Sequence, residues 1–132
     1  MPNVNVRVGN GAAAPYTRPI EFAVTAVWDA ADDNALAADS VQAVDIPAGT
    51  LVEVIRWEVE TAEGAVGTFT VGDNAAVDQF LAATNLNALA EGVSAAAARK
   101  YYSAADIVRI VPSINSDLVR ITLTVVGVSF PV

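Results

Sequence analysis

Carboxylates are the only reactive side chains that this sequence offers in number. It contains 15 Asp and Glu residues but no histidine and no cysteine. The imidazole and thiolate ligands of zinc and haem are therefore missing, and so are the residues of Ser-His and Cys-His catalysis. The chemistry that remains is that of paired carboxylates, either in glycoside hydrolysis or in the binding of a hard cation.

Glu53, Glu58 and Glu60 are the candidates for carboxylate catalysis, because they lie on one predicted strand. Glu53 falls on the same face as Ile55 and Trp57, and a glutamate held against a tryptophan has the raised pKa that a general acid needs. The alternative is that the strand bulges or twists near its start, so that Glu53 pairs with an arginine or faces a subunit interface. The sequence favours this alternative, and we predict that the protein is not an enzyme.

Two clusters of oxygen-bearing side chains are candidates for calcium binding. The first consists of Asp29, Asp32 and Asp33, which lack the glycine and the downstream glutamate of an EF-hand loop; a solvated acidic loop is favoured. The second is the run 72–74 with Asp78, where Asp73 is expected to fold back on its own backbone as turn residues do. We therefore predict no metal and no cofactor.

The charge balance argues against nucleic acid as a partner. The 15 acidic residues outnumber the seven cationic residues, so the net charge is −8. A protein that binds duplex nucleic acid needs a basic surface instead. The sequence has a single cationic-aromatic cluster, which consists of Arg99, Lys100, Tyr101 and Tyr102. We interpret it as the beginning of a strand or as a subunit contact. An anionic membrane surface is disfavoured for the same reason, and no apolar run approaches the roughly 20 residues of a membrane span.

The beginning of the sequence lacks a basic segment followed by an apolar one, so no secretory signal is visible. We therefore expect synthesis in the cytoplasm.

The elements that position these residues are predicted strands. A short strand pattern covers residues 3–8, and longer ones cover residues 19–28, 41–46, 51–60, 66–71, 101–111 and 118–128. The strands at 51–60 and 66–71 are predicted to form a hairpin, and so are those at 101–111 and 118–128. Residues 29–39 are expected to form a long loop, and residues 77–98 a short helix or an irregular connection.

Alternation within these strands predicts which side chains face the core. The inward residues are expected to be Ile20, Phe22, Val24, Ala26 and Trp28, then Leu51, Ile55, Trp57 and Val59, then Phe69 and Val71, and finally Val119, Ile121, Leu123 and Val125. Both tryptophans lie on apolar faces, so they are interpreted as core residues. A sugar-binding module would instead carry flat aromatic side chains on a polar platform.

Seven or eight strands at spacings near ten residues predict an all-β protein, a single β-sandwich of jelly-roll or Greek-key type. We assign residues 19–132 to the sandwich and residues 1–18 to an N-terminal arm. In the arm, Val4, Val6 and Val8 alternate with polar residues, and a glycine-rich stretch follows. The arm is interpreted either as reaching a neighbouring subunit or as a loose terminus. The candidate interface residues are Val4, Val6, Val8, Tyr16, Arg18, Arg99, Lys100 and Tyr101.

Three segments carry a resemblance to a known group of proteins. They are residues 46–50 before a long strand, residues 67–73 running on to 78–81, and residues 101–107 before the last strands. In this order they are similar to small structural proteins of tailed bacteriophages and prophages, over residues 41–128. The shared residues are architectural, so no functional residue is carried over.

The resemblance implies a virion protein that decorates or cements a phage capsid. Its expected partners are its own copies, as a homo-oligomer and with a trimer as the expected state, and the major capsid protein. Its expected location is the capsid surface. The alternative is a carbohydrate- or receptor-binding β-sandwich of a phage tail or fibre.

Overall fold

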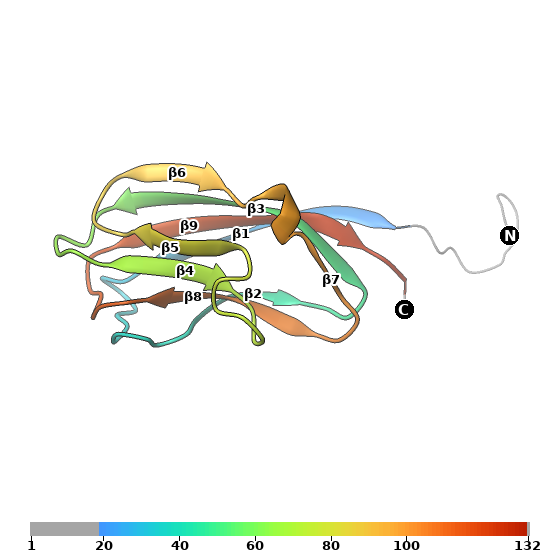
Figure 1. Cartoon of the computed structure of the whole chain (residues 1–132), viewed down its shortest axis with the longest axis horizontal. Helices are drawn as coiled ribbons and strands as arrows, with labels where there is room; N and C mark the ends of the chain where they lie inside the picture. The colour runs from blue at the N-terminus through green and yellow to red at the C-terminus, as the bar shows by residue number, and fades with distance from the viewer. Residues whose placement is uncertain (1–18, 132) are drawn as a thin grey trace, which may run out of the picture.

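Antiparallel strands make up most of the computed structural model, which describes residues 19–131 (Figure 1). The strands are β1 (Ile20–Asp29), β2 (Val41–Ile46), β3 (Thr50–Thr61), β4 (Thr68–Gly72), β5 (Leu81–Asn85), β6 (Ala90–Val93), β7 (Lys100–Tyr102), β8 (Asp106–Pro112) and β9 (Arg120–Ser129). A single 3-10 turn, η1 (Ala96–Ala98), precedes β7. Within residues 19–131, no helix is long and apolar enough to cross a membrane.

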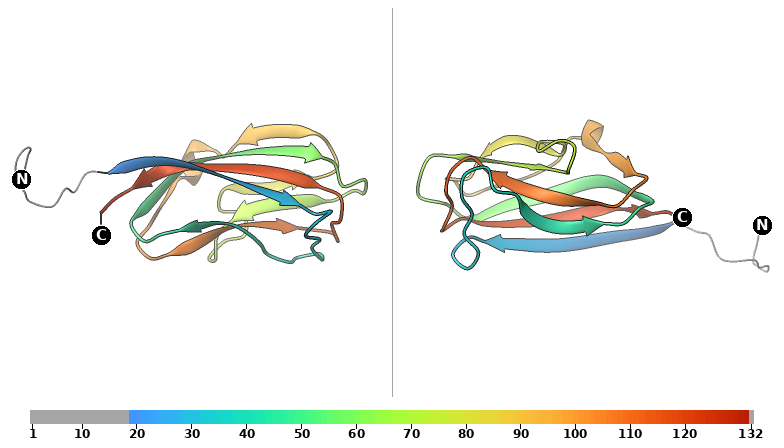
Figure 2. Two further views of the ribbon diagram at one scale, coloured as in Figure 1. Left: turned by 180° about the vertical axis from the view of Figure 1, so that it is seen from behind. Right: turned by 90° about the horizontal axis from the view of Figure 1, so that it is seen from below.

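The strands form two sheets that pack face to face (Figure 2). One sheet has the order β1-β9-β3-β6, with β7 also paired to β3, and the other has the order β2-β8-β4-β5. The pairs β1–β9, β2–β8, β3–β6 and β4–β5 are those of one long hairpin wrapped into two sheets, which is the jelly-roll arrangement. The predicted fold class is confirmed, with β7 as an additional short strand.

The core lies between the sheets, and β9 contributes its central row. Val119, Ile121, Leu123 and Val125 are fully buried, while Arg120, Thr122 and Thr124 lie on the opposite face, as predicted. Phe69 and Val71 are also fully buried, and Trp28 is 4% exposed. Trp57 is half-buried and packs against the core, where its ring meets Phe69 edge-on at a centroid distance of 5.8 Å.

Both predicted hairpins are wrong, because the paired strands lie in opposite sheets. β3 pairs with β6, β7 and β9, whereas β4 pairs with β5 and β8. Likewise β8 pairs with β2 and β4, and β9 with β1 and β3. Crossing the sandwich brings the apolar faces of successive strands against each other, as the contact between Trp57 and Phe69 shows. Sequence proximity therefore leads here to packing across the core instead of hydrogen bonding side by side.

Residues 77–98 do not form the expected short helix or irregular connection. They contain the strands β5 and β6, which complete the two sheets beside β4 and β3, and the turn η1. Alanine, asparagine and glycine are poor strand formers. These segments become strands because β3 and β4 present unpaired edges to them.

In two strands, β3 and β1, the burial of the inward side chains differs from the prediction. A bulge between Val52 and Val54 shifts the start of β3, so that Val52 is fully buried and Leu51 is half-buried. In β1 the alternation holds, but Ile20 and Val24 are 67% and 44% exposed, because β1 is an edge strand. The predicted strand at 101–111 is divided into β7 and β8 by a bend at 103–105.

Candidate functional site

The cationic-aromatic cluster at the start of β7 is already neutralised within the chain. Arg99 forms an ion pair with Glu53 at 3.6 Å, and Lys100 Nζ lies 2.8 Å from Asp73 Oδ2. Lys100 also lies 5.1 Å from the centre of the Tyr102 ring. With both cations paired, this cluster presents no free positive charge to a phosphate backbone, and what remains accessible is the ring of Tyr101.

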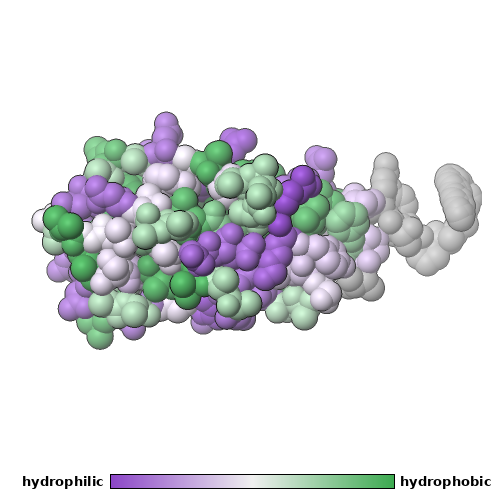
Figure 3. Space-filling view, viewed as in Figure 1, coloured by the Kyte–Doolittle hydropathy of each residue, from purple (hydrophilic) through white to green (hydrophobic). Residues whose placement is uncertain are grey.

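Tyr101 belongs to a small exposed apolar group at the end of the molecule where β1 begins and β9 finishes. Its ring contacts Phe130 edge-on at a centroid distance of 6.3 Å, and the two residues are 50% and 37% exposed. Ile20 begins β1 opposite Ser129 and is also largely exposed, but the strand register places it on the other face of the sheet from Tyr101. We call Tyr101 and Phe130 the aromatic end. On the face shown in Figure 3, apolar and polar side chains alternate without one dominant patch.

Asp73 is a buried carboxylate that fastens the loop between β4 and β5. Its Oδ2 accepts hydrogen bonds from Lys100 Nζ at 2.8 Å and from the Tyr102 hydroxyl at 2.7 Å. Its Oδ1 accepts from the amides of Ala75 and Ala76 at 3.0 and 2.9 Å, so the side chain folds back on its own turn, as predicted. All four bonds connect Asp73 to the loop or to β7, which gives Asp73 a structural role.

The surroundings of Asp73 also shift the ionisation of the residues that meet there. Burial raises the pKa of Asp73, but the hydrogen bonds from Lys100, Tyr102 and the two amides outweigh burial and hold the pKa below its ordinary value. The pKa of Tyr102 is raised, first by burial and then by its bond to Asp73. The charged carboxylate and the neutral phenol are therefore the stable forms at neutral pH.

Glu63 is a second buried carboxylate and lies in the connection between β3 and β4. Its Oε1 accepts hydrogen bonds from the backbone amides of Asp117, Leu118 and Val119 at 3.1, 3.1 and 2.9 Å. Burial raises the pKa of Glu63, but these amide bonds outweigh burial and keep the pKa below its ordinary value. Glu63 thus ties the β3–β4 connection to the β8–β9 connection, and no local pattern in the sequence indicates that role.

Three other carboxylates form ion pairs with arginines. Glu53 lies at the β3 bulge, paired with Arg99, which is the alternative that the sequence favoured over a general acid beside Trp57. Arg120 bonds both Glu60 and Asp29, at 2.6 and 3.3 Å. Within residues 19–131, no group of three or more Asp and Glu residues is arranged to hold a metal ion.

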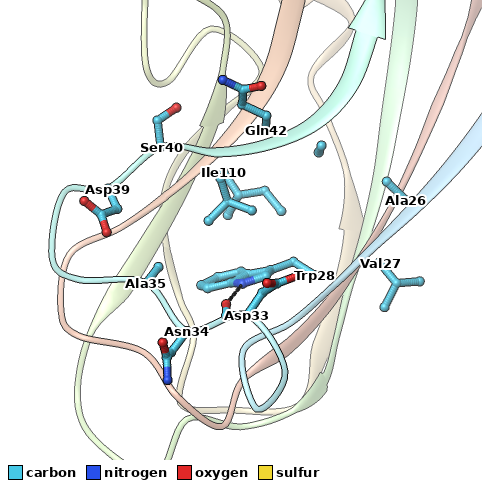
Figure 4. A pocket seen from close by; sticks show the side chains of 12 residues that line it. Ala26, Val27, Trp28, Asp33, Asn34, Ala35, Asp39, Ser40, Gln42 and Ile110 are labelled. Atoms are coloured by element: carbon cyan, nitrogen blue, oxygen red, sulfur yellow. Dashed lines mark hydrogen bonds between the residues drawn. The ribbon is translucent and has the colours of Figure 1, made fainter.

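A groove runs along one side of the sandwich, between the edge strands β1 and β2. It has a cavity volume of about 440 Å³ and is lined by residues 26–28, 33–35 and 39–43 and by Ile110. We call it the lateral groove. In Figure 4, Trp28 and Ile110 lie at its floor and Asp33, Asp39 and Ser40 around its rim. Asn34 and Gln42 add amide groups to the same lining.

The lateral groove is apolar at its floor and acidic at its rim. Trp28 is buried, and its Nε1 donates to the backbone oxygen of Asp33 at 2.8 Å, so its ring is held in place and does not form an exposed platform. Arg109 bonds Ser40 Oγ at 2.9 Å. Asp33 and Asp39 have no ion pair with any residue in the described part of the chain.

Five of the eight candidate interface residues, Val4, Val6, Val8, Tyr16 and Arg18, lie outside the described residues. Of the remaining three, Arg99 and Lys100 make ion pairs within the chain and Tyr101 is available to a partner.

Comparisons with known proteins relate the chain to others by its fold. No protein-family model matches it, and no curated protein matches it. Among solved structures, three similar chains come from phage capsids. The first is from the acid-stable capsid of Helicobacter pylori bacteriophage KHP30, with 15% identity and a TM-score of 0.64, covering 86% of this chain and 93% of that chain.

The second similar chain is from the capsid asymmetric unit of cyanophage Pam1, with 15% identity and a TM-score of 0.61 over 99% of this chain and 100% of that one. The third is from the capsid of Ralstonia phage GP4, with 16% identity and a TM-score of 0.56 over 94% and 91%. The chain thus shares its jelly-roll fold, over nearly its whole length, with chains found in phage capsids.

Proposed function

We propose that this protein is a virion structural protein that decorates or cements a phage capsid through contacts between subunits and with the shell beneath. The observation that carries the proposal is the fold match to three capsid chains, which extends over 91–100% of those chains. Each of them is therefore close in extent to this one jelly roll. A chain of this size adds to a shell as a separate subunit.

The surface of the protein agrees with such a role. The aromatic end exposes Tyr101 and Phe130 together, and exposed apolar groups of this kind commonly mark a partner surface. The net charge of −8 helps to keep the free protein soluble before assembly. Its partners under this proposal are the major capsid protein and its own copies, and a trimer is the oligomeric state that we expect.

The copy number in purified particles tests the proposal. We expect hundreds of copies per particle, measured by quantitative mass spectrometry against the major capsid protein, because a decorating subunit repeats over the shell. A handful of copies would contradict the proposal and favour the carbohydrate- or receptor-binding protein of a tail or fibre. Analytical ultracentrifugation of the free protein tests the trimer.

A surface variant tests which end of the molecule meets the particle. Tyr101→Asp places a charge in the aromatic end, and we expect it to reduce binding to particles that lack the protein, without a matching loss of thermal stability. Val66→Asp is the control, since Val66 is 89% exposed in the connection at the far end of β3. Equal binding by both variants would exclude the aromatic end as the contact.

A further inference from the structure

We propose that the free edge of β1 binds residues Val4–Val8 of a second copy of this chain as an added β-strand. The inference deepens the proposed function, on which it rests, by naming the contact through which copies join. Strand addition to an exposed sheet edge is a common mode of peptide recognition, in which main-chain hydrogen bonds supply affinity and alternate side chains supply specificity.

The edge of β1 is long, regular and unprotected. Its ladder with β9 runs without interruption from Ile20, opposite Ser129, to Asp29, opposite Arg120, and its other edge has no strand partner among the described residues. Natural edges are usually blunted by lysine, proline or a bulge. Within β1 none of these occurs, and Ile20, Val24 and Val27 are 67%, 44% and 49% exposed.

The charges of the two segments are complementary. Residues 1–18 carry Arg7 and Arg18 and no acidic residue, whereas all 15 Asp and Glu residues lie in residues 19–132. Glu21 lies on β1 itself, and Asp33 and Asp39 lie on the rim of the lateral groove that runs beside it. If two β1 edges paired with each other, the charged residues at the new contact would all be acidic, because β1 carries Glu21 and Asp29 and no cation. Charge therefore favours the N-terminal segment as the occupant.

The pattern of the segment also fits the two faces of β1. Val4, Val6 and Val8 alternate with Asn5 and Arg7. The inner row of β1 is apolar and includes Val24 and Ala26, of which Ala26 lines the lateral groove, while its outer row includes Glu21 and Thr25. An added strand in which the valines extend the inner row places Arg7 in the outer row, on the side of Glu21.

Reach and proline positions favour a second copy over the same copy. Eighteen residues precede Pro19 and could span roughly 60 Å when extended, about twice the length of ten-residue β1. Ala14 and Arg18 each precede a proline, and such residues favour extended backbone. A reversal of the chain directly before β1, which docking on its own edge would need, is therefore disfavoured.

Photo-cross-linking of the purified full-length chain tests the inference. The protein has no cysteine, so Val6→Cys can be labelled at one site with a benzophenone maleimide. Labelled copies are mixed with cysteine-free wild-type copies grown in ¹⁵N, and cross-linked peptides are identified by mass spectrometry. We expect cross-links from position 6 to residues 20–29 of the ¹⁵N chain. Val66→Cys, labelled in the same way, is the control and should give none to β1.

Two sets of variants sharpen the test. Val24→Lys should abolish the cross-link because it places a charge in the inner row, whereas Val93→Lys, on the opposite edge strand β6, should leave it intact. Arg7→Glu should reduce the yield about fivefold, as expected for loss of a favourable ion pair of about 1 kcal/mol, and Glu21→Arg should restore it.

Cross-links within one chain, cross-links to other strands, or equal yields for Val24→Lys and Val93→Lys would each overturn the inference. Since the experiment uses the free protein, its outcome is independent of the copy number in particles, so this inference and the proposed function can fail separately.

Discussion

At the scale of single residues, two buried carboxylates hold the connections of the sandwich in place by different means. Asp73 is held by a lysine, a phenol and two amides, whereas Glu63 is held mainly by backbone amides. Each side chain satisfies one buried donor, the Tyr102 hydroxyl in the case of Asp73 and the Val119 amide in the case of Glu63, which would otherwise lack a partner. Both residues are therefore expected to contribute to stability and not to chemistry.

Asp73→Ala should lower the free energy of unfolding by about 3 kcal/mol, the lower end of the range for breaking a buried ion pair, because Lys100 is partly exposed and can be solvated. Urea unfolding followed by circular dichroism measures the change. Asp78→Ala is the matched control, since Asp78 is exposed in the same loop and its removal should change stability by less than about 0.5 kcal/mol. Equal effects of the two substitutions would refute the role assigned to Asp73.

The lowered pKa values of Asp73 and Glu63 predict acid sensitivity. A carboxyl whose pKa is lower in the folded than in the unfolded state contributes stability above its unfolded value, and this contribution is lost as the pH falls through the folded value. The ordinary values are 3.8 and 4.5, so the melting temperature should fall as the pH decreases below them. The pKa of Asp117 is raised by its bond to Glu63, which offsets part of the loss.

Thermal melts between pH 6 and pH 2.5 measure this dependence. In the double variant Glu63→Gln with Asp73→Asn, the decrease in melting temperature towards acid should be smaller than in the wild type. An identical slope in the two proteins would show that other groups control the acid response.

At the scale of elements, β3 is the strand that organises its sheet. It pairs with β9 on one edge and with β6 and β7 on the other, and its bulge changes which side chains face inward at its start. After the bulge, Ile55, Trp57 and Val59 face the core while Arg56 and Glu58 face outward. The register of this one strand therefore fixes the inner and outer faces of its neighbours.

Trp57→Ala should destabilise the protein by about 2–3 kcal/mol, less than the 3–5 kcal/mol typical of a fully buried tryptophan, because Trp57 is half-buried. The physical reason is loss of its packing against Phe69 and the core. Arg56→Ala next to it should change stability by less than about 1 kcal/mol, since Arg56 is exposed. Thermal melts of both variants compare them, and a larger effect for Arg56→Ala would mean that the register is wrong.

At the scale of the whole molecule, the buried residues of the jelly roll come from strands and connections between Ile20 and Ser129. Trp28, Phe69, Leu123 and the other fully buried side chains contact one another across the two sheets and form one cluster. We expect this core to sustain the fold without a contribution from residues 1–18. The free edge of β1 and the aromatic end lie outside it, and they are the surfaces that we propose for contacts between molecules.

Deletion of residues 1–18 should leave the β-sheet circular dichroism unchanged and the melting temperature within a few degrees of the full-length value, because the buried cluster within residues 19–131 already joins both sheets. It should also weaken self-association, measured by sedimentation at several concentrations. Loss of the β signal in the truncated protein would show instead that Val4, Val6 and Val8 belong to the core of their own domain.

The sequence by itself determined the fold class and most of the inward rows. Side chains alternate between the two faces of any strand, whatever its partner. The alternation therefore identified the buried row of the last strand, which is Val119, Ile121, Leu123 and Val125. The turn role of Asp73 was identifiable for the same local reason, since aspartate bonds the amides two and three residues further on.

Only the tertiary structure decided which strands are neighbours and which side chains meet. Segments 51–60 and 66–71 read as a hairpin, but they lie in opposite sheets because burial of both apolar faces outweighs pairing across a short turn. The bonds from Lys100 and Tyr102 to Asp73, and those from the 117–119 amides to Glu63, join residues 27 to 56 positions apart. The lateral groove exists because the wrapped hairpin leaves β1 and β2 as edges on the same side. Alternation is a property of one strand, whereas pairing and packing depend on every other strand of the sandwich.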